Sequence, residues 1–353
     1  MSLALLLGGV NAGCAPAPSA PAALAPEPAP PEGPAPAQVW RSKAGRRYTG
    51  QVVVAGETVY AGSVDRKVYA VDLATGQVRW SSRLGGIIGG GVLVVGDTVY
   101  AASGRPEGKV YALDAHTGRR LWRTTTGTVS APLALIHGAV VAQTQRGDVF
   151  ALDPTAGTVR WRRAVGFARI AAVAADSGTL VVATIDSLFR LRAADGKIVT
   201  RARSPGAIVS PWLPHRGLLV AGTTDSAVVA IGPDDLRPRW RAALDAPVLG
   251  TPAAQGDTLY AASRRGTLYR IAPDSAPTAS AIAELDWPVT SPVTVLDGLV
   301  LLGGADGVLR ALRPDGTEIW RLQLRWPVDL GPLPLDDGMI AIGGDGDLHR
   351  YRR

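Results

Sequence analysis

Tryptophan recurs along this chain at a nearly constant interval. Six of the nine tryptophans in the 353 residues share one sequence context: Trp40, Trp80, Trp122, Trp161, Trp240 and Trp320. Their spacings are 40, 42 and 39 residues and then 79 and 80, which places two skipped positions at Thr200 and Ser280. A period near 40 residues is typical of arrays in which each unit stacks on its neighbours, propellers among them.

Each period is predicted to contain four short strands. Gly-Asp or Asp-Gly pairs, as at Gly96-Asp97 and Asp297-Gly298, mark a hairpin between the first two strands. Later strands such as Val110–Leu113 are apolar throughout rather than alternating, which indicates a sheet covered on both faces. Propeller blades are covered in this way because each is sandwiched between two neighbours.

One phrase, Tyr111–Trp122, has close copies on both sides, so its role is expected to be structural. Asp114, Thr117 and Gly118 are predicted to form the turn between the third and fourth strands, with Asp accepting backbone hydrogen bonds and Gly adopting positive φ. Trp122 then offers one large apolar ring that staples adjacent sheets. The six repeated tryptophans are therefore structural staples.

The two ends of the chain are expected to close the ring. The last period, after Trp320, holds three strands and lacks its own tryptophan strand, and an orphan strand around Trp40 would supply it. Pairing the two ends removes two exposed sheet edges. The predicted fold is all-β: an eight-bladed β-propeller over residues 38–353, with four-stranded antiparallel blades and a ring closed by the N- and C-terminal strands.

The N-terminus has the composition of a lipoprotein leader and tether. Residues 1–14 form an apolar run that ends at Cys14, which predicts a lipoprotein-type signal peptide with lipid attached to Cys14. Residues 15–37 are almost entirely Pro and Ala, which predicts a disordered spacer. This predicts an exported protein held on the membrane by its N-terminal lipid, and an unprocessed tail is the alternative.

The sequence offers no recognisable catalytic set. Cys14 is the sole cysteine, which excludes an internal disulfide and a Cys-rich metal centre. The four histidines have no metal-ligand spacing, and no Gly-rich phosphate loop leads from a strand into a helix. Neither catalytic residues, a metal site nor a cofactor is predicted. Nucleic acid is not an expected partner either, because basic and aromatic residues do not interleave.

Two further tryptophans stand at one repeat position in the loops that lead into the innermost strand. They are Trp287, in Leu-Asp-Trp-Pro-Val, and Trp326, in Leu-Arg-Trp-Pro-Val. These loops are expected to surround the channel mouth on one face of the ring. Two interpretations are open: each tryptophan caps its own inter-blade seam, or the two present a partner-binding surface, since exposed Trp is a common interface anchor.

The positive charge lies entirely after residue 40. Ring closure would bring seven cations toward one blade: Arg41, Lys43, Arg46, Arg47, Arg350, Arg352 and Arg353. Anionic lipid headgroups would attract such a cluster by roughly 1 kcal/mol per charge close to the membrane surface. A membrane-facing basic patch and a solvated basic edge are both consistent with the pattern.

The repeat resembles that of a known family. The phrase Ala-x-Asp-x-x-Thr-Gly-x-x-x-Trp, as in residues 70–80 and 112–122, is similar to the repeat of the PQQ-like (quinoprotein) β-propellers, and the likeness covers residues 38–353. Quinoprotein dehydrogenases of this family bind PQQ and calcium in the channel and use a catalytic Asp and an adjacent Cys-Cys disulfide. A chain with Cys14 alone cannot form that disulfide.

A second branch of the family, the BamB type, consists of eight-bladed lipoproteins that serve the outer-membrane β-barrel assembly machinery without catalysis. Resemblance to this branch implies a non-catalytic protein-binding scaffold, lipid-anchored on the periplasmic side of the outer membrane or at the cell surface. Its partners would be cell-envelope proteins such as the barrel assembly machinery. The alternative is a ligand-binding or degenerate quinoprotein propeller without the dehydrogenase site.

Overall fold

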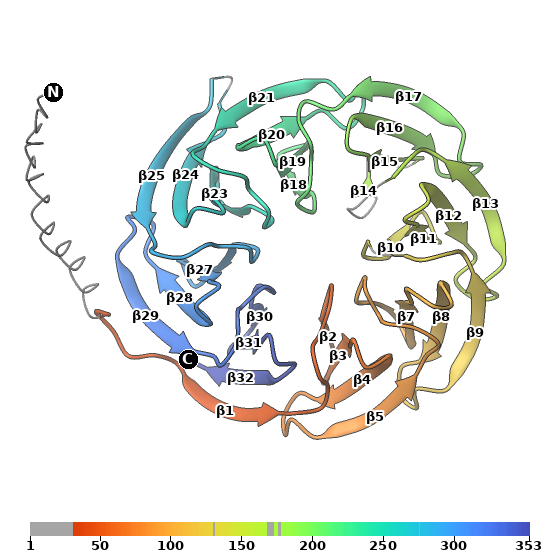
Figure 1. Ribbon diagram of the computed structural model, residues 1–353, viewed down its shortest axis with the longest axis horizontal. Coiled ribbons are helices and arrows are strands. Elements are labelled where there is room, and N and C mark those ends of the chain that lie inside the picture. Colours follow the sequence, from red (N-terminus) through yellow and green to blue (C-terminus); the bar gives the residue numbers. More distant parts are fainter. Residues whose placement is uncertain (1–30, 130, 168–172, 176–177, 275) are drawn as a thin grey trace, which may run out of the picture. The chain divides into compact units, whose positions relative to one another are not determined.

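The computed structural model describes residues 31–129, 131–167, 173–175, 178–274 and 276–353. These residues form eight four-stranded antiparallel sheets arranged as the blades of a ring (Figure 1). The eight-bladed all-β propeller predicted from the sequence is confirmed. The blades are numbered along the chain, starting with the one that contains β2.

Blades one to four run from the inner to the outer strand as β2 (Val53–Ala55), β3 (Thr58–Gly62), β4 (Lys67–Asp72) and β5 (Val78–Arg83); β6 (Val92–Val95), β7 (Thr98–Ala102), β8 (Lys109–Asp114) and β9 (Arg120–Thr125); β10 (Ala134–Ile136), β11 (Ala139–Gln143), β12 (Asp148–Leu152) and β13 (Val159–Ala164); β14 (Val173–Ala174), β15 (Thr179–Ala183), β16 (Ser187–Arg192) and β17 (Ile198–Arg203).

Blades five to eight continue as β18 (Leu213–His215), β19 (Leu218–Gly222), β20 (Ala227–Ile231) and β21 (Pro238–Ala243); β22 (Ala253–Gln255), β23 (Thr258–Ala262), β24 (Thr267–Ala272) and β25 (Thr278–Glu284); β26 (Thr294–Leu296), β27 (Leu299–Gly303), β28 (Val308–Leu312) and β29 (Glu318–Gln323); β30 (Leu333–Leu335), β31 (Gly338–Ile342) and β32 (Leu348–Arg352), completed by β1 (Ala37–Ser42).

Blade eight is built from both ends of the chain. Its outer strand β1 pairs antiparallel with β32, in a register that sets Trp40 opposite Arg350 and Ser42 opposite Leu348. The ring is therefore closed as predicted, and neither terminal strand is left with two free edges. β1 begins at Ala37, one residue before the boundary expected from the sequence.

The hydrophobic core is divided among the seams between blades. Eight clusters of buried residues are present, one for each pair of neighbouring blades. In the seam between blades three and four, Val141 and Val149 from one sheet pack with Leu180 and Phe189 from the next. Because each sheet buries its faces only against its neighbours, a blade has no complete core of its own.

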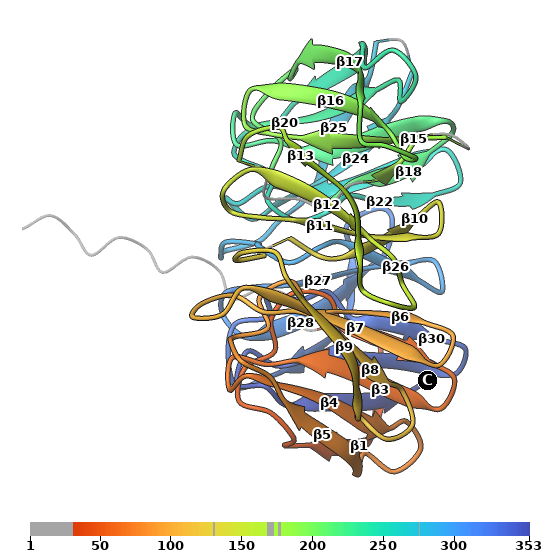
Figure 2. The same cartoon turned by 90° about the vertical axis from the view of Figure 1, so that its right-hand side faces the viewer.

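The ring has two faces with different loops (Figure 2). One, the turn face, carries the turns between first and second strands and between third and fourth strands, and the Leu73 amide bonds the Glu57 carbonyl there at 2.9 Å. The other, the loop face, carries the turns between second and third strands and the loops between blades, where the Leu84 amide bonds the Arg66 carbonyl at 2.7 Å. A candidate binding residue in a turn or loop therefore lies on one of these two faces.

The repeated tryptophans lie in outer strands and bind the following blade. The indole Nε1 of Trp161 in β13 donates to the Ala193 carbonyl of blade four at 2.7 Å, and the same bond joins Trp40 to Leu73 in blade one at 2.9 Å. Trp80 and Trp122 repeat the contact at 2.8 and 2.9 Å. The staple therefore joins one blade to the third-to-fourth turn of the next.

The Thr-Gly of the repeat is the other half of this staple. Gly196 has φ of 67°, and a Cβ built on it would overlap the Trp161 ring of the preceding blade. The Asp of the phrase forms the turn as predicted: Asp72 Oδ1 accepts from the Thr75 amide at 2.8 Å, and Arg79 bonds Oδ2 of the same carboxylate. The Arg79 guanidinium and these Thr75 bonds lower the pKa of Asp72 to about 2.

A pair of glycine substitutions separates the staple from simple backbone strain. Gly138 has nearly the same φ, 68°, but a Cβ there would meet nothing within 4 Å. Gly138→Ala is therefore expected to cost only the left-handed backbone penalty, about 1–2 kcal/mol. Gly196→Ala should cost about 1–3 kcal/mol more, because it also overpacks the seam. Urea unfolding of both variants measures the difference, and equal costs would show that Gly196 is needed for its φ alone.

Four seams depart from the repeat. At the seam after β21, the Trp240 indole Nε1 is buried without a hydrogen-bond partner in the described part of the chain. At Thr200 in β17 the tryptophan is absent. The next blade has Leu236 at the turn position that corresponds to Gly196, and Leu236 is fully buried with φ of 59°. At Ser280 in β25 the tryptophan is again absent, and the Ile282 backbone instead approaches Gly316 of blade seven. At Trp320 the next blade is blade eight, whose third and fourth strands come from opposite chain ends and so share no turn.

A strap of residues 31–36 lies where that missing turn would be. The Gly33 amide donates to the Ile319 carbonyl at 2.7 Å, and Glu32 forms an ion pair with Arg313 at 2.6 Å. The strap and Trp320 line one cavity on the turn face. These residues belong to the segment 15–37 expected to be a disordered spacer, yet they contact the ring because the seam has no turn to cover it.

Candidate functional site

The loops that carry Trp287 and Trp326 lie on the loop face, each following the outer strand of its blade. Trp287 follows β25 and Trp326 follows β29, so the two stand one blade apart as the sequence predicted. Their environments differ, however. The structure favours a separate interpretation for each residue.

Trp287 is held against blade seven. The guanidinium of Arg310, itself only 3% exposed, lies 3.4 Å from the centroid of the Trp287 ring, and the ring also packs over Gly304. Arg310 is fixed in turn by the Asp306 carboxylate at 2.7 Å. A cation over an indole face in a desolvated site is stabilising, so Trp287 caps its own inter-blade seam.

Trp326 is 57% exposed, the second-highest exposure among the large hydrophobic side chains in the described residues. In the third strand of blade seven Arg310 pairs with Arg321, and in the third strand of blade eight His349 pairs with Arg41. Arg321 and Arg41 each directly follow the tryptophan of their outer strand, so His349 stands at the position equivalent to Arg310. Burial and the charge of Arg41 lower the pKa of His349, which keeps its ring neutral near pH 7. Blade eight thus offers no buried cation from that position, and the Trp326 side chain is left in solvent.

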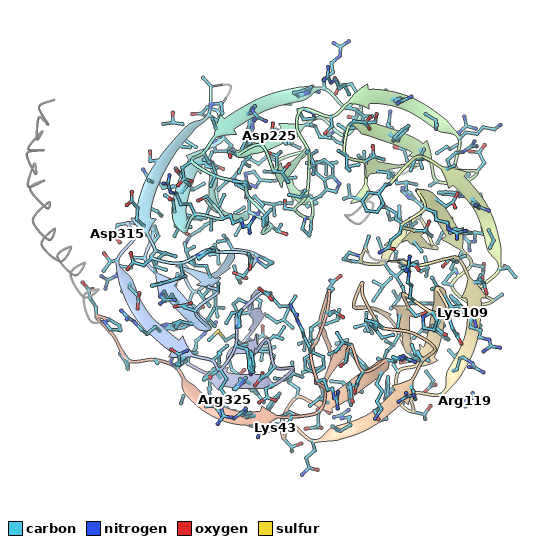
Figure 3. The ribbon with its side chains drawn as sticks, in the orientation of Figure 1. Lys43, Lys109, Arg119, Asp225, Asp315 and Arg325 are labelled. Carbon is cyan, nitrogen blue, oxygen red and sulfur yellow. The ribbon has the colours of Figure 1, made fainter. Side chains whose placement is uncertain are left out.

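The seven cations expected to form one basic patch are split between the two faces. Arg350, Arg352 and Arg353 lie toward the turn-face end of β1 and β32, whereas Lys43, Arg46 and Arg47 follow the other end of β1. The length of the six-residue strand β1, roughly 17–20 Å, separates Arg352 from Lys43. Figure 3 labels Lys43 and Arg325 in the sector of the ring that holds β1 and β32.

Most of these cations are also neutralised by carboxylates. Arg41 pairs with Asp347 and Asp345, Arg47 with Asp329 at 3.1 Å, Arg350 with Asp337 at 2.8 Å, Arg352 with Asp337 at 3.3 Å, and Arg353 with Asp297. The single basic patch expected from sequence is therefore not formed, because the residues that follow β1 and the residues that end β32 lie at opposite ends of this antiparallel strand pair.

A cavity lies where the inter-blade loops turn into the inner strands. Its lining is mostly apolar and comes from blades one, three, five, seven and eight: Gly50, Gln51, Val52, Pro132, Pro211, Pro292, Thr294, Leu330, Gly331, Pro332, Leu333 and Ile342. PQQ is an anionic, multiply carboxylated quinone, and no Lys or Arg of the described lining is available to bind it. No group of three or more His, Cys, Asp or Glu side chains in the described ranges could hold a metal ion. The residues present do not fit PQQ with calcium.

The expected lipidation site lies outside the described residues. Cys14, the signal segment 1–14 and the tether as far as residue 30 are not part of the described structure. Within the residues that are described, no helix has the length and apolar character needed to cross a bilayer.

Sequence reasoning found the tryptophans but missed two sets of residues that decide how they act. Arg310 is an isolated arginine in an apolar strand, and its role depends on a ring from the previous blade. The strap carries the same Pro/Ala composition as the tether before it, so composition gave no signal of contact. Both depend on contacts between blades.

The fold and its seams define an eight-bladed β-propeller of the PQQ-like class, with one exposed tryptophan on the loop face. The family model described as "Outer membrane protein assembly factor BamB" matches residues 34–189 and 186–279, and the chain belongs to this family. No curated protein matches the sequence.

Solved structures with the same architecture come from proteins of different kinds. BamB from Moraxella catarrhalis is 18% identical, with 90% of this chain and 100% of that chain covered and a TM-score of 0.77. The computationally designed protein Ika8 is 14% identical, with 90% and 99% covered and a TM-score of 0.76. The quinohemoprotein alcohol dehydrogenase ADHIIG from Pseudomonas putida HK5 is 14% identical, with 88% and 72% covered and a TM-score of 0.72. At these identities the likeness shows the fold alone.

Proposed function

We propose that this protein is a non-catalytic, lipid-anchored scaffold that binds protein partners during outer-membrane β-barrel assembly. The observation that carries the proposal is membership of the BamB family over residues 34–279. The apolar run ending at Cys14 supports export and lipid anchoring on the periplasmic side of the outer membrane or at the cell surface. The Pro/Ala segment that follows would be the spacer between lipid and ring.

We place partner docking on the loop face, with Trp326 as its anchor. The strap and β1 bring the chain into the ring on the turn face, where Ala37 pairs with Arg352. A partner reaching the loop face therefore does not compete with the proposed tether. An exposed tryptophan contributes a large contact area at low entropic cost, which is typical of interface hot spots.

A ligand-binding or degenerate quinoprotein propeller is the second candidate, supported by the likeness to the alcohol dehydrogenase fold. The mostly apolar lining of the cavity between the inter-blade loops and the inner strands weighs against a quinone cofactor. An apolar small molecule held in that cavity would support this second candidate.

Co-purification from native membranes tests the proposal. Tagged wild-type protein should retain barrel-assembly components, and Trp326→Ala should weaken that retention by about 2 kcal/mol or more, roughly thirtyfold in affinity. Val78→Ala, which trims a 46% exposed side chain on an outer strand, is the matched control and should retain partners fully.

Both variants should keep the wild-type thermal midpoint, because neither side chain is buried. Equal retention by Trp326→Ala and wild type would remove Trp326 from the interface. Recovery of a bound small molecule without any envelope protein would instead support the second candidate.

A further inference from the structure

The outer strand of every blade presents one unpaired edge to solvent, and such edges attract other strands. Proteins commonly protect them with positive charge or with β-bulges that twist the edge away. The eight outer strands of this ring, all within the described residues, can be compared position by position. One of them has no positive charge, and its bulge lies at a different place from the others.

Positive charge is present in seven of the outer strands and absent from the eighth. Arginine occurs in β5 (VRWSSR), β9 (RLWRTT), β13 (VRWRRA), β17 (IVTRAR), β21 (PRWRAA), β29 (EIWRLQ) and β1 (AQVWRS). By contrast β25 reads TASAIAE, with neither Lys nor Arg, and Glu284 at its end is its single charge. It is also the longest of the eight, at seven residues.

The bulge is displaced in the same strand. In the other seven outer strands one extra residue stands directly before the tryptophan position, such as Arg79 between the paired residues Val78 and Trp80. In β25 the extra residue is Ile282, near the opposite end. The run Thr278–Ala281 is therefore paired with β24 without interruption.

The side chains of this run allow another backbone to approach. Thr278, Ser280 and Ala281 are exposed, and none of them is bulky. Ser280 stands at the tryptophan position of the repeat, so this strand has no large ring on its outer side. The seam is closed instead by the Ile282 backbone, which packs on Gly316. The run itself has small side chains and no charge, and the cation nearest to it in register is Arg270 of β24, opposite Ser280.

The chain itself shows that an outer edge of this ring accepts an extended segment. On the neighbouring blade the strap lies against β29, with the Glu32 amide bonded to the Glu318 carbonyl at 3.3 Å and the Gly33 amide to the Ile319 carbonyl at 2.7 Å. Both of these hydrogen bonds join backbone groups. β25 offers an edge of the same kind with no segment of this chain on it in the described ranges.

We propose that the outer edge of β25 binds an extended, uncharged segment of a partner polypeptide by strand addition. Backbone hydrogen bonds to residues 278–281 supply the affinity, and Glu284 disfavours acidic residues at one end of the segment. This site is separate from the loop face around Trp326, so the inference goes beyond the proposed function and stands without it.

Hydrogen exchange with a defined peptide tests the proposal. The probe is a ten-residue peptide of alternating Thr and Val with blocked ends, added to the full chain. Exchange of the outward-facing amides within residues 278–281 should slow at least tenfold at saturating peptide. Exchange in β5, whose edge carries Arg79 and Arg83, should not change.

Matched lysine variants identify the edge. Ala281→Lys adds a charge to the exposed edge of β25, and Ser81→Lys adds the same charge at the equivalent register position of β5, since both residues are opposite the third-strand tyrosines Tyr269 and Tyr69. Ala281→Lys should weaken peptide binding at least tenfold, and Ser81→Lys should leave it unchanged. Thr278→Lys repeats the test if Ala281→Lys unfolds.

Several results would overturn the proposal. Equal slowing in β5 and β25, or binding unaffected by Ala281→Lys and Thr278→Lys, would show that the edge is not selective. Loss of binding in Trp326→Ala with no protection of residues 278–281 would move the peptide to the loop face. Concentration-dependent dimers abolished by Ala281→Lys, without peptide protection, would make a second copy of this chain the occupant.

Discussion

Trp161→Ala is expected to destabilise the ring by about 3–5 kcal/mol, the range for removing a large aromatic side chain from a core. Trp161 is 8% exposed, its Nε1 donates to the Ala193 carbonyl at 2.7 Å, and its ring covers Gly196. The substitution removes the apolar contact and leaves the Ala193 carbonyl without this donor. The free energy of unfolding from urea titration measures the effect.

Trp326→Ala is the control for that measurement, because the same side chain is removed from a 57% exposed site. It should change stability by no more than about 0.5 kcal/mol. A Trp161→Ala cost as small as that of Trp326→Ala would mean that the staples do not hold the seams.

The second large effect is expected at Leu236, which replaces the staple where Thr200 stands in place of tryptophan. Leu236→Gly should cost about 2–4 kcal/mol: removal of a fully buried leucine costs about 2–5 kcal/mol, and glycine relieves about 1 kcal/mol of strain at its φ of 59°. Thr200→Trp alone should cost about 1–3 kcal/mol, because the new ring meets Leu236.

The double variant decides whether the two positions form one seam. Thr200→Trp with Leu236→Gly recreates the tryptophan-on-glycine staple of Trp161 and Gly196, so its stability should return to within about 1 kcal/mol of wild type. Costs that simply add would show that the positions are independent. The readout is again the free energy of unfolding, with all four proteins measured together.

The regular part of the fold could be predicted because it depends on short-range interactions that recur in each repeat. Turn residues such as Asp114 and Gly118 act within a few residues of themselves, and a period near 40 fixes the size of a blade. The skipped staples at Thr200 and Ser280 were located by spacing alone, and both lie in outer strands. Ring closure followed from counting strands.

The sequence identified the candidate binding residues but not the surroundings of their side chains. Trp287 and Trp326 share one motif, and nothing local separates them, since the difference lies in Arg310 and His349 on the following blades. The seven cations belong to two paired strands, yet Lys43, Arg46 and Arg47 follow one end of the pair while Arg352 and Arg353 lie at the other end. The signal and tether assigned to residues 1–37 stay predictions, apart from the strap.

The sequence by itself determined the number of blades, the order of strands and the positions of the staples, because these depend on short-range turn chemistry and on a period. The tertiary structure alone decided which seams need a substitute, which tryptophan faces solvent and which outer strand has its bulge displaced. Those outcomes depend on side chains that meet across blades, about 40 residues or a whole ring apart, and no local pattern encodes such contacts.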